Sequence, residues 1–596
     1  MSRESINSSD ILNKINGDVI FTIHNKDVTG ELRVDGSKSF NNIFFDNVVF
    51  YNDVLIYNID KFISIGFFNC EFHANLRFES LGLPESGKEK AIDRNISINN
   101  CKKVSALFFE RIHSINISIN TSKIDCLNLS DVNCLGGKLE ITNCQEIVYF
   151  DSINSSIFQD VLVENNTILS DVFLSENEFR TVTIQENDFK QGIYFNQGNK
   201  INQFEISNNK FRFAQIAFSI STDYVLEKFD LSENKVEEDF KLFFAEFSPT
   251  SEKTSLRLCN NRFLGRFICM PSDENKTITI NDLKIEYSGF SSGEVNFSDI
   301  IIEKFSSTGY LDSASRLIFN KAQFQNVDFD SFTSKGVVQY FNCMAKNNSS
   351  TKLKIKNSVL GDMQFRNSTI DSFSSIEMSN TDLSLITISP IPHKPISADK
   401  IVSQANNQKI KHRIKNLCIE QNEDNEAVNS LRQERDIFRQ LKLVCEKSGD
   451  RTGGLYYKSY EMRTLHRELI RTKRFFNANR LLLTLSRTNS YGQNYWWPIL
   501  WAFLFTAIFY IIIFTGISPQ IEFKVTTNPK AWWESIVILC ENFPLMFKML
   551  NPVYDLTRFP GPLEINSWVW PFEYLHKLTL AFFIFQTISA FRKFVK

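Results

Sequence analysis

A short unit that reads apolar-x-apolar-x-polar-Asn-x-apolar recurs along the first two thirds of the chain, and it constrains the fold more than any other feature. The two leading apolar residues lie two positions apart, which is the period of a strand with one buried face, and the polar-Asn pair interrupts that alternation. Each unit therefore predicts a short strand that enters a turn. Copies of the unit are VFLSENEF (172–179), VTIQENDF (182–189), FEISNNKF (204–211), FDLSENKV (229–236), LRLCNNRF (256–263), LKIKNSVL (353–360) and MQFRNSTI (363–370).

Neighbouring units lie about 10 to 12 or about 22 to 25 residues apart, which predicts a coil with about two to three strands per turn. Asn suits the turn because it tolerates the left-handed backbone, and stacked copies could form an Asn ladder. We therefore expect a mainly β chain whose first domain, 1–390, is a parallel, right-handed β-helix. Leucine-rich repeats would need further leucines at fixed offsets, and pentapeptide repeats, a near neighbour, would need a five-residue period that is not sustained here.

Composition excludes several classes of function. Lysine plus arginine nearly balance aspartate plus glutamate, with a net charge of −2, so no nucleic-acid partner is expected. The 11 cysteines have no metal-ligand spacing, which favours buried small side chains in a reducing compartment. The segment 1–10 contains no apolar run of a secretory signal, so the β-helix is expected to stay on the side of the membrane where it is made.

A proline cluster marks the expected end of the β-helix. SPIPHKPIS (389–397) places three prolines in a few residues, which breaks strand pairing. The second domain, 391–490, is then a Pro-rich linker and a cytoplasmic helical connector. It is predicted to hold one helix from Glu426 to Lys447 and another over about 455–476, with a stop at Gly449 and Asp450.

The third domain, 491–596, is predicted to lie in the membrane. WWPILWAFLFTAIFYIIIFTGI (496–517) is uncharged and long enough to span a bilayer, with Trp496 and Trp497 as interfacial anchors. A second span is expected at 568–591, although Glu573, His576 and Lys577 make its first turns polar. Two spans would form a transmembrane hairpin.

Polar residues in this domain are candidates for lining a pore or packing helices. Gln586 lies in the middle of the second span, where an amide needs a partner on another helix. The segment 531–550 is apolar but carries Glu534, Glu541 and Asn542, so it is expected to be interfacial or re-entrant rather than a third span.

Basic residues flank both spans and set the expected orientation. They are Arg471, Lys473, Arg474, Arg480 and Arg487 before the first span, and Arg592, Lys593 and Lys596 after the second. The positive-inside rule then places the N- and C-termini of a multi-pass protein in the cytoplasm, with Arg592 and Lys593 as further interface anchors.

The segment FRQLKLVCEKSGDRTGGLYYKSYEMRTL (438–465) has an aromatic-Arg-x-Leu-Lys run, then Gly-Asp, then a Glu-Met ending. It resembles the helical connector of bacterial pentapeptide-repeat-like membrane proteins, in which a two-transmembrane hairpin follows the connector. The matching positions are Phe438, Arg439, Leu441, Lys442, Gly449, Asp450, Glu461 and Met462, then Tyr491, Gly492, Trp497 and Pro498, then Leu550, Asn551 and Pro552, and finally Gln586, Ile588, Ala590, Phe591, Arg592 and Lys593. The resemblance covers 432–596 and implies a bacterial inner-membrane location, but no reaction.

No enzyme is expected. Parallel β-helices often hold paired carboxylates, but Glu176, Glu186 and Glu233 occupy the turn position of the repeat and, with Asp230, form no local cluster. The seven histidines lack metal-binding spacing, and phosphate-binding and nucleophile motifs are absent from the sequence, so no cofactor or metal is predicted.

Two functions from different classes are consistent with this organisation. In the first, the solenoid is a cytoplasmic scaffold or sensor that binds a protein partner and is anchored in the lipid bilayer. In the second, a homo-oligomer of the hairpins forms a pore or channel gated by the solenoid, which by analogy would suit defence against phage. A homo-oligomer is expected in either case.

Overall fold

The fold is taken from a computed structural model of the chain. It describes residues 3–15, 20–36, 41–59, 62–82, 94–113, 115–154, 156–196, 199–218, 226–244, 254–273, 277–286, 293–346, 350–368, 372–389, 401–402, 421–472, 478–517, 529–558 and 565–595. The chain divides into two compact units, Met1–Val402 and Ser403–Lys596. Most of the proline cluster at 389–397 lies outside the described residues.

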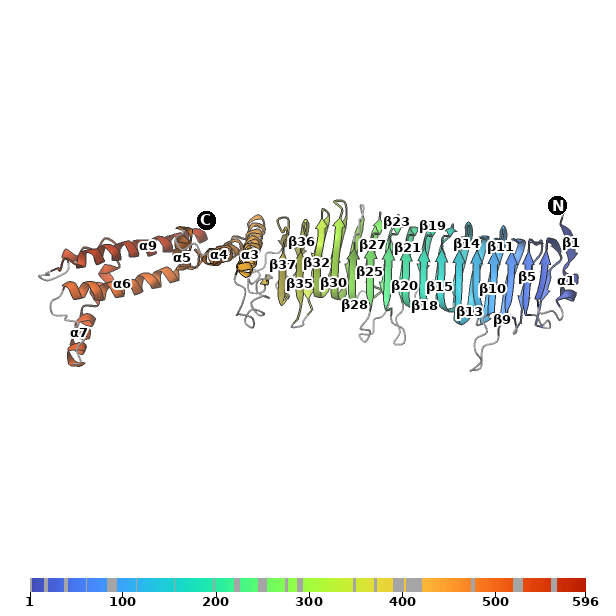
Figure 1. Ribbon diagram of the computed structural model, residues 1–596, viewed down its shortest axis with the longest axis horizontal. Helices are drawn as coiled ribbons and strands as arrows, with labels where there is room; N and C mark the ends of the chain where they lie inside the picture. The colour runs from blue at the N-terminus through green and yellow to red at the C-terminus, as the bar shows by residue number, and fades with distance from the viewer. Residues whose placement is uncertain are drawn as a thin grey trace. The chain divides into compact units, whose positions relative to one another are not determined.

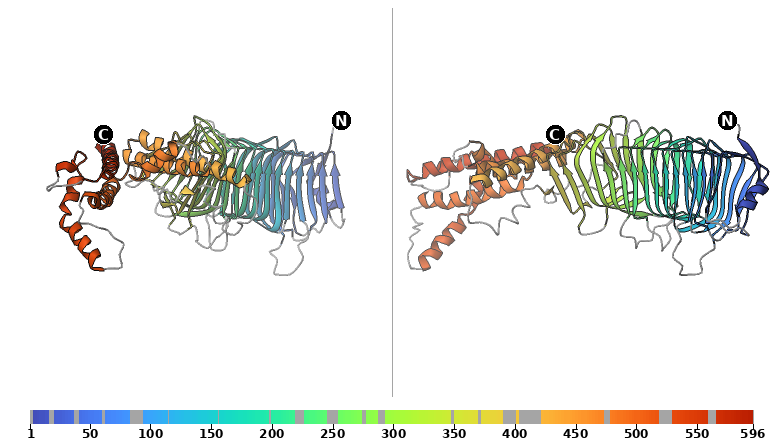
Figure 2. Two further views of the ribbon diagram at one scale, coloured as in Figure 1. Left: turned by 60° about the vertical axis from the view of Figure 1, so that its left-hand side comes forward. Right: turned by 45° about the vertical axis from the view of Figure 1, so that its right-hand side comes forward.

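The first unit is a parallel β-solenoid of about 14 turns, as the sequence predicts. Its described strands belong to one sheet of 39 strands, and the pairings between turns of these strands are parallel (Figure 1). In β18, for example, Val182 lies opposite Phe204 of the next turn and Val161 of the preceding turn. Figure 2 shows the same stacking of turns from two further sides.

The strands follow one another in chain order. They are β1 (Glu4–Asn7), β2 (Ile20–His24), β3 (Lys26–Thr29), β4 (Leu32–Val34), β5 (Asn42–Asp46), β6 (Val49–Phe50), β7 (Val54–Tyr57), β8 (Ser64–Phe68), β9 (Glu71–Leu81), β10 (Arg94–Asn99), β11 (Lys103–His113), β12 (Ile115–Asn120), β13 (Lys123–Thr142), β14 (Glu146–Asn154), β15 (Ile157–Glu164), β16 (Thr167–Ile168), β17 (Val172–Ser175), β18 (Glu178–Gln185), β19 (Asp188–Phe195), β20 (Lys200–Ser207), β21 (Lys210–Phe218), β22 (Lys228–Ser232), β23 (Lys235–Val236), β24 (Phe240–Phe244), β25 (Ser255–Cys259), β26 (Arg262–Phe263), β27 (Arg266–Pro271), β28 (Ile278–Glu286), β29 (Glu294–Ser298), β30 (Ile300–Leu311), β31 (Arg316–Asn320), β32 (Gln323–Ser334), β33 (Val337–Phe341), β34 (Met344–Ala345), β35 (Lys352–Lys356), β36 (Asp362–Arg366), β37 (Ser375–Ser379), β38 (Thr387–Ser389) and β39 (Ile401–Val402).

Phenylalanine fills much of the solenoid interior, which accounts for a large share of the 56 Phe of the sequence. Strands in adjacent turns are about 4.8 Å apart, so aromatic side chains in the same register stack at nearly that distance. The ring centroids of Phe45 and Phe67 are 4.9 Å apart with planes inclined by 6°, and those of Phe189 and Phe211 are also 4.9 Å apart. Stacking therefore repeats the strand spacing inside the core.

The corner of each turn uses a left-handed residue that faces solvent, followed by an inward-pointing residue. In the units between 172 and 263 the left-handed residue is the first of the polar-Asn pair, with φ between 52° and 58°. It is a glutamate at Glu176, Glu186 and Glu233, contrary to the sequence-based expectation, and an asparagine at Asn208 and Asn260, in agreement with it. The expectation does hold for Asn357 and Asn367 in the last two units.

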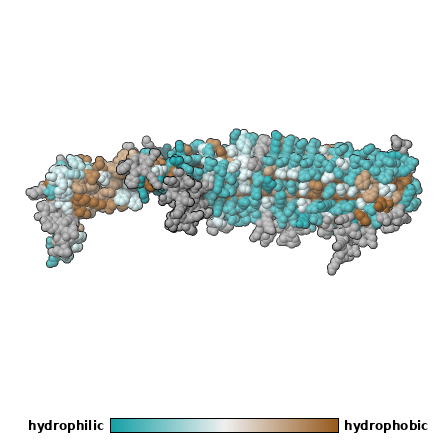
Figure 3. Space-filling model, in the orientation of Figure 1, coloured by the Kyte–Doolittle hydropathy of each residue, from teal (hydrophilic) through white to brown (hydrophobic). Residues whose placement is uncertain are grey.

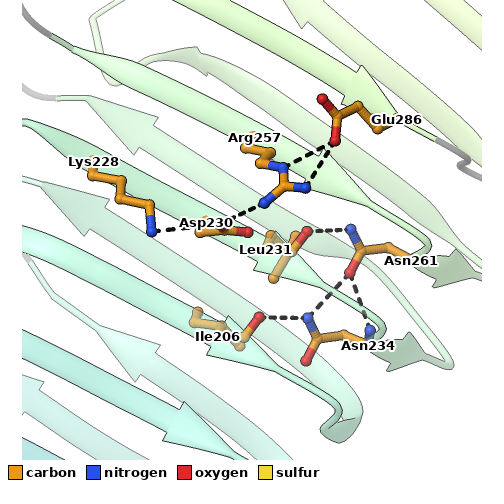
Figure 4. Close-up of polar contacts among 8 residues, drawn as sticks. All are labelled: Ile206, Lys228, Asp230, Leu231, Asn234, Arg257, Asn261 and Glu286. Carbon is orange, nitrogen blue, oxygen red and sulfur yellow. Dashed lines mark hydrogen bonds and ion pairs between the residues drawn. The ribbon is translucent and has the colours of Figure 1, made fainter. Parts of the chain in front are cut away.

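The inward Asn residues form the predicted ladder. The side-chain Nδ2 of Asn187 donates to the carbonyl oxygens of Val163 and Gln185, both at 2.8 Å, while its backbone N–H donates to Oδ1 of Asn209 at 2.9 Å. Asn209 repeats the pattern on Asn234. Figure 4 shows the next step, in which Asn234 Nδ2 donates to the carbonyl of Ile206 and its backbone N–H donates to Asn261 Oδ1.

Cysteine and serine take the same inward position in other turns. The Cys70 thiol donates to the carbonyls of Phe68 at 3.2 Å and Phe45 at 3.4 Å. Ser358 Oγ donates in the same way to Lys356 at 2.6 Å. Burial raises the pKa of Cys144, another member of the series, to about 11, so its thiol stays protonated and able to donate. The expectation of buried cysteines is confirmed at Cys70, Cys101, Cys134, Cys144, Cys269 and Cys343. It fails at Cys540, which is exposed, and Cys126, Cys259 and Cys445 are only half-buried; all described cysteines are free.

A short helix covers the N-terminal end of the solenoid. The helix α1 (Ser8–Lys14) packs against β4, and its Ile11 side chain is completely buried. Ile15, directly after the helix, is also buried. The Asn7 side chain caps the helix by accepting from Ser9 N–H at 3.3 Å. The helix thus shields an apolar end that would otherwise be open to water or to another strand.

The second unit is helical. Its described elements are α3 (Gln421–Lys447), α4 (Arg451–Arg471), α5 (Ala478–Arg487), α6 (Trp496–Ile517), α7 (Pro529–Glu541), α8 (Pro544–Met549), the 3₁₀ turn η2 (Leu556–Arg558) and α9 (Val569–Val595). The helical hairpin predicted in the connector is present as α3 and α4. Gly449 ends α3 with φ of 77°, and the Asp450 side chain caps α4 by accepting from Gly453 N–H at 2.8 Å.

We predict that Asn209→Ala lowers the free energy of unfolding by about 1 to 3 kcal/mol, because it leaves buried carbonyl and N–H groups without partners. Asn209→Ser keeps a hydroxyl donor like that of Ser358, so it should lower the free energy of unfolding by less than Asn209→Ala does. Asn208→Gly at the exposed left-handed position is the control, with a change within about 1 kcal/mol. Urea unfolding of the full chain followed by circular dichroism measures all three, and equal losses at 208 and 209 would contradict the ladder.

Candidate membrane-embedding site

The connector residues singled out by the resemblance form the packed joint between α3 and α4. Phe438 is buried against the Tyr460 ring, with centroids 5.4 Å apart, and Lys442 forms an ion pair with Glu461 at 3.7 Å. Leu441 is also buried, Met462 is half-buried and Arg439 is exposed. Gly449 and Asp450 make the turn described above.

A buried carboxylate fixes the two connector helices to each other. Glu468 on α4 accepts from Arg432 Nε at 2.9 Å and from an Arg435 guanidinium nitrogen at 2.6 Å, both on α3. A charge-assisted pair of this kind has strict geometry. The connector is therefore held together by specific polar contacts as well as by apolar packing.

The helices α6 and α9 pack side by side and run in opposite directions. Tyr495 beside the start of α6 stacks on Phe591 near the end of α9, with centroids 4.5 Å apart, and Phe505 contacts Phe583 farther along. At the other end Gly516 lies so close to α9 that an added Cβ would come within 2.3 Å of Val569. The lack of a side chain at 516 permits this close approach.

Polar side chains at the start of α9 are turned into the helical unit and paired there. The His576 ring nitrogens lie 3.1 Å from the Tyr554 hydroxyl and 3.1 Å from Thr506 Oγ1 on α6. Glu573 forms an ion pair with Lys577 at 2.7 Å. The polar groups that weaken the second predicted span thus have partners inside the chain.

The opposite face of α6 is apolar and exposed. The exposed side chains recur every three or four residues at Trp496, Leu500, Leu504, Ile508 and Ile511, which places them on one stripe of the helix. Leu500 is 58% exposed and Ile508 is 45% exposed. On α9, Leu578 and Phe585 are exposed as well, and Figure 3 shows hydrophobic residues gathered on the visible face of this unit.

Within the described residues, α6 is the one helix long and apolar enough to cross a membrane. The helix α9 covers the second predicted span but does not meet that criterion, so the two-span hairpin is not confirmed. Trp496 and Trp497 lie exposed in the first turn of α6. Arg592 and Lys593 belong to the last turns of α9, and their side chains lie outside the part of the chain that is described.

The middle segment forms α7 and α8, with a break that ends at Pro544, the first residue of α8. Glu534 and Glu541 are exposed, and the Asn542 side chain donates to the carbonyl of Ile538 at 2.9 Å. These three candidates are not partners in the α6–α9 polar contacts given above. A re-entrant path for this segment is not confirmed.

Gln586 has a partner that the sequence did not reveal. Its Oε1 accepts a hydrogen bond from Nδ2 of Asn489, a buried residue in the segment between α5 and α6. Asn489 is far from Gln586 in sequence, so only the antiparallel return of α9 brings the two amides together. The contact fits the helix-packing role considered for Gln586.

The candidate acids of the solenoid are dispersed. Glu176, Glu186 and Glu233 sit at separate left-handed corners of the solenoid. Asp230 is buried and lies 3.6 Å from Lys228 and 3.5 Å from Arg257, which also binds Glu286 at 2.8 Å (Figure 4). No group of His, Cys, Asp or Glu among the described residues could hold a metal ion.

We predict that Gln586→Met lowers the stability of the detergent-solubilised chain by roughly 1 kcal/mol, because Asn489 loses the acceptor of its buried amide. Ile588→Met, at an exposed position two residues farther along α9, should change the stability little. Thermal unfolding followed by tryptophan fluorescence tests both variants. If Gln586→Met left stability intact but changed ion flux through liposomes, Gln586 would line a pore instead.

Comparison of the chain with protein-family models, curated protein sequences and solved structures finds no match in any of the three. Fold and site geometry are therefore the basis for assigning a function.

Proposed function

We propose that the helical unit anchors the chain in a bacterial inner membrane and that the solenoid serves there as a cytoplasmic protein-binding scaffold or sensor. One observation carries the proposal: α6 exposes a continuous apolar stripe while its other face holds the polar contact with His576. Water-soluble helices have the reverse arrangement, with the exposed face polar. A helix of this kind is suited to lipid.

The dimensions and flanks of α6 agree with a crossing. Its 22 residues extend for roughly 33 Å, close to the roughly 30 Å thickness of a hydrocarbon core. Tryptophans begin the helix, as is typical of a membrane interface. Because α9 returns antiparallel to α6, a second crossing by α9 would bring Arg487 and the basic end of α9 to one side, which the positive-inside rule assigns to the cytoplasm.

A long repeated surface supports the scaffold part of the proposal. Solenoids bind partners over extended faces, and this one carries exposed aromatic residues among polar ones. Phe173 on β17 is exposed and stacks on Tyr194 of β19 with centroids 5.0 Å apart, and Lys241 lies over the nearby Phe213 ring. Such aromatic contacts are common anchors at protein interfaces.

The gated-pore alternative receives less support. It requires Gln586 to face an axis shared by several copies, whereas the Gln586 amide accepts from Asn489 of the same chain. Asn542, another candidate for pore lining, donates its side-chain amide to Ile538 of its own segment, while Glu534 and Glu541 are exposed and favour neither reading. The anchored scaffold is therefore favoured over the pore, and a homo-oligomer of anchored chains is compatible with it.

We predict that Ile508→Arg prevents stable membrane integration, because a charge at the middle of a spanning helix costs about 2.5 to 3.5 kcal/mol. Leu482→Arg, on the exposed face of α5, is the matched control and should integrate normally. Carbonate extraction and flotation of membranes from expressing cells measure both. If Ile508→Arg stayed in the membrane fraction as the unaltered chain does, or if the unaltered chain did not float, the anchor would be ruled out.

A further inference from the structure

A basic pocket lies in the helical unit beside the start of α6. It has a volume of about 450 Å³, and its walls come from α4, the end of α5 and the segment that joins α5 to α6. Its polar lining consists of Arg463, His466, Arg467, Arg487, Ser490 and Tyr491. Among the residues that the structure describes, the lining contains three guanidinium groups and no carboxylate.

The carboxylates nearby offset only part of this charge. Arg467 forms an ion pair with Glu434 on α3 at 3.7 Å. Glu468, the next residue along α4, is held on the α3 side by Arg432 and Arg435. Arg463 lies 4.9 Å from the centre of the Tyr460 ring, which orients its guanidinium without cancelling its charge. Three like charges around one pocket repel each other, and a bound anion would relieve that repulsion.

The walls of the pocket are held in place by a buried histidine. The His466 ring lies 3.2 Å from the Tyr491 hydroxyl and 3.2 Å from Thr484 Oγ1 on α5, so it joins three segments. Burial, followed by the positive charges of Arg487 and Arg480, lowers the pKa of His466 below its ordinary value. The shift agrees with a positive potential in this region.

The backbone at the pocket is strained. Ser490 and Tyr491 have φ of 51° and 57°, and Gly492 follows with 86°, so three consecutive residues are left-handed. Two of them carry side chains, which makes the conformation costly, and such strain is found preferentially at functional sites. Asn489 stabilises it, because its side-chain oxygen accepts from Gly492 N–H at 2.7 Å while its amide donates to Gln586.

We propose that this pocket binds a phosphate group, as a monoester or diester anion, through the guanidinium groups of Arg463, Arg467 and Arg487 with the hydroxyl of Ser490 as a further donor. Guanidinium forks match the geometry of phosphate oxygens and bind them with two parallel hydrogen bonds. The phosphate could belong to an anionic lipid headgroup or to a soluble phosphate compound. The lipid source rests on the proposed function, because the pocket would then lie at the level of the cytoplasmic headgroups.

Calorimetry on the detergent-solubilised full chain tests the proposal with three probes: inorganic phosphate, short-chain phosphatidylglycerol and short-chain phosphatidylcholine. We expect binding of at least one of the first two, weakened roughly tenfold to a hundredfold in Arg463→Gln and in Arg487→Gln. Arg487→Lys keeps the charge but loses the forked guanidinium, so its affinity should lie between that of the unaltered chain and that of Arg487→Gln. Arg451→Gln, at the opposite end of α4 and outside the pocket, should bind as the unaltered chain does.

Each result has a distinct meaning. Stronger binding of phosphatidylglycerol than of inorganic phosphate identifies a headgroup, and the reverse identifies a soluble ligand. Absence of binding, or equal losses in Arg451→Gln and the pocket variants, overturns the proposal, provided that circular dichroism shows all variants folded. Flotation of Arg463→Gln membranes separates this outcome from a failed anchor, since the pocket can fail while flotation is intact.

Discussion

At several corners of the solenoid a small inward side chain donates a hydrogen bond to carbonyl groups of the turning backbone, while at others an apolar residue such as Val48 or Ile300 takes this position. A parallel stack pairs its strands completely, but the corner between two strands leaves polar backbone groups facing the core, where an unpaired group costs about 1 to 3 kcal/mol. The side chain of Asn187 donates such a hydrogen bond at one corner, that of Cys70 at another and that of Ser358 at a third. Because the backbone geometry repeats, the residue type can change while the bond is retained.

The helical unit arranges polar and apolar groups in the reverse way. Its polar side chains, such as His576 and Gln586, meet partners inside the unit, and the apolar side chains of the α6 stripe point outward. In water this arrangement would expose a large hydrophobic surface. In a bilayer it would satisfy every requirement, since lipid accepts the stripe and the protein interior accepts the polar groups.

Much of the fold could be predicted from sequence because its signals are local. The repeating strand-and-corner unit predicted a parallel solenoid, and the Gly449-Asp450 pair predicted the α3–α4 turn. The left-handed residue was assigned wrongly in units such as SENEF because both Glu176 and Asn177 are polar, and only the backbone decides which of them points inward. The corner role of Cys70 was missed for a related reason: a cysteine carries no visible preference for a turn, and its thiol is a weak donor.

The candidate site was less accessible to such reasoning because its contacts join distant segments. Asn489 meets Gln586 only through the return of α9, and Arg463 meets Arg487 only through the chain reversal between α4 and α5. No periodic pattern marks these pairs. The apolar run at 496–517, by contrast, was found directly, because length and hydropathy are properties of a continuous segment.

The account depends most on α6 being surrounded by lipid, and spin labels along its exposed stripe test this directly. Labels would be placed at Leu500, Leu504, Ile508 and Ile511 of the chain reconstituted in nanodiscs. We expect collisions with oxygen to exceed collisions with a water-soluble nickel complex at 504, 508 and 511, with the smallest difference at 500, close to the interface. Nickel accessibility at all four positions would contradict the account, because α6 would then face water.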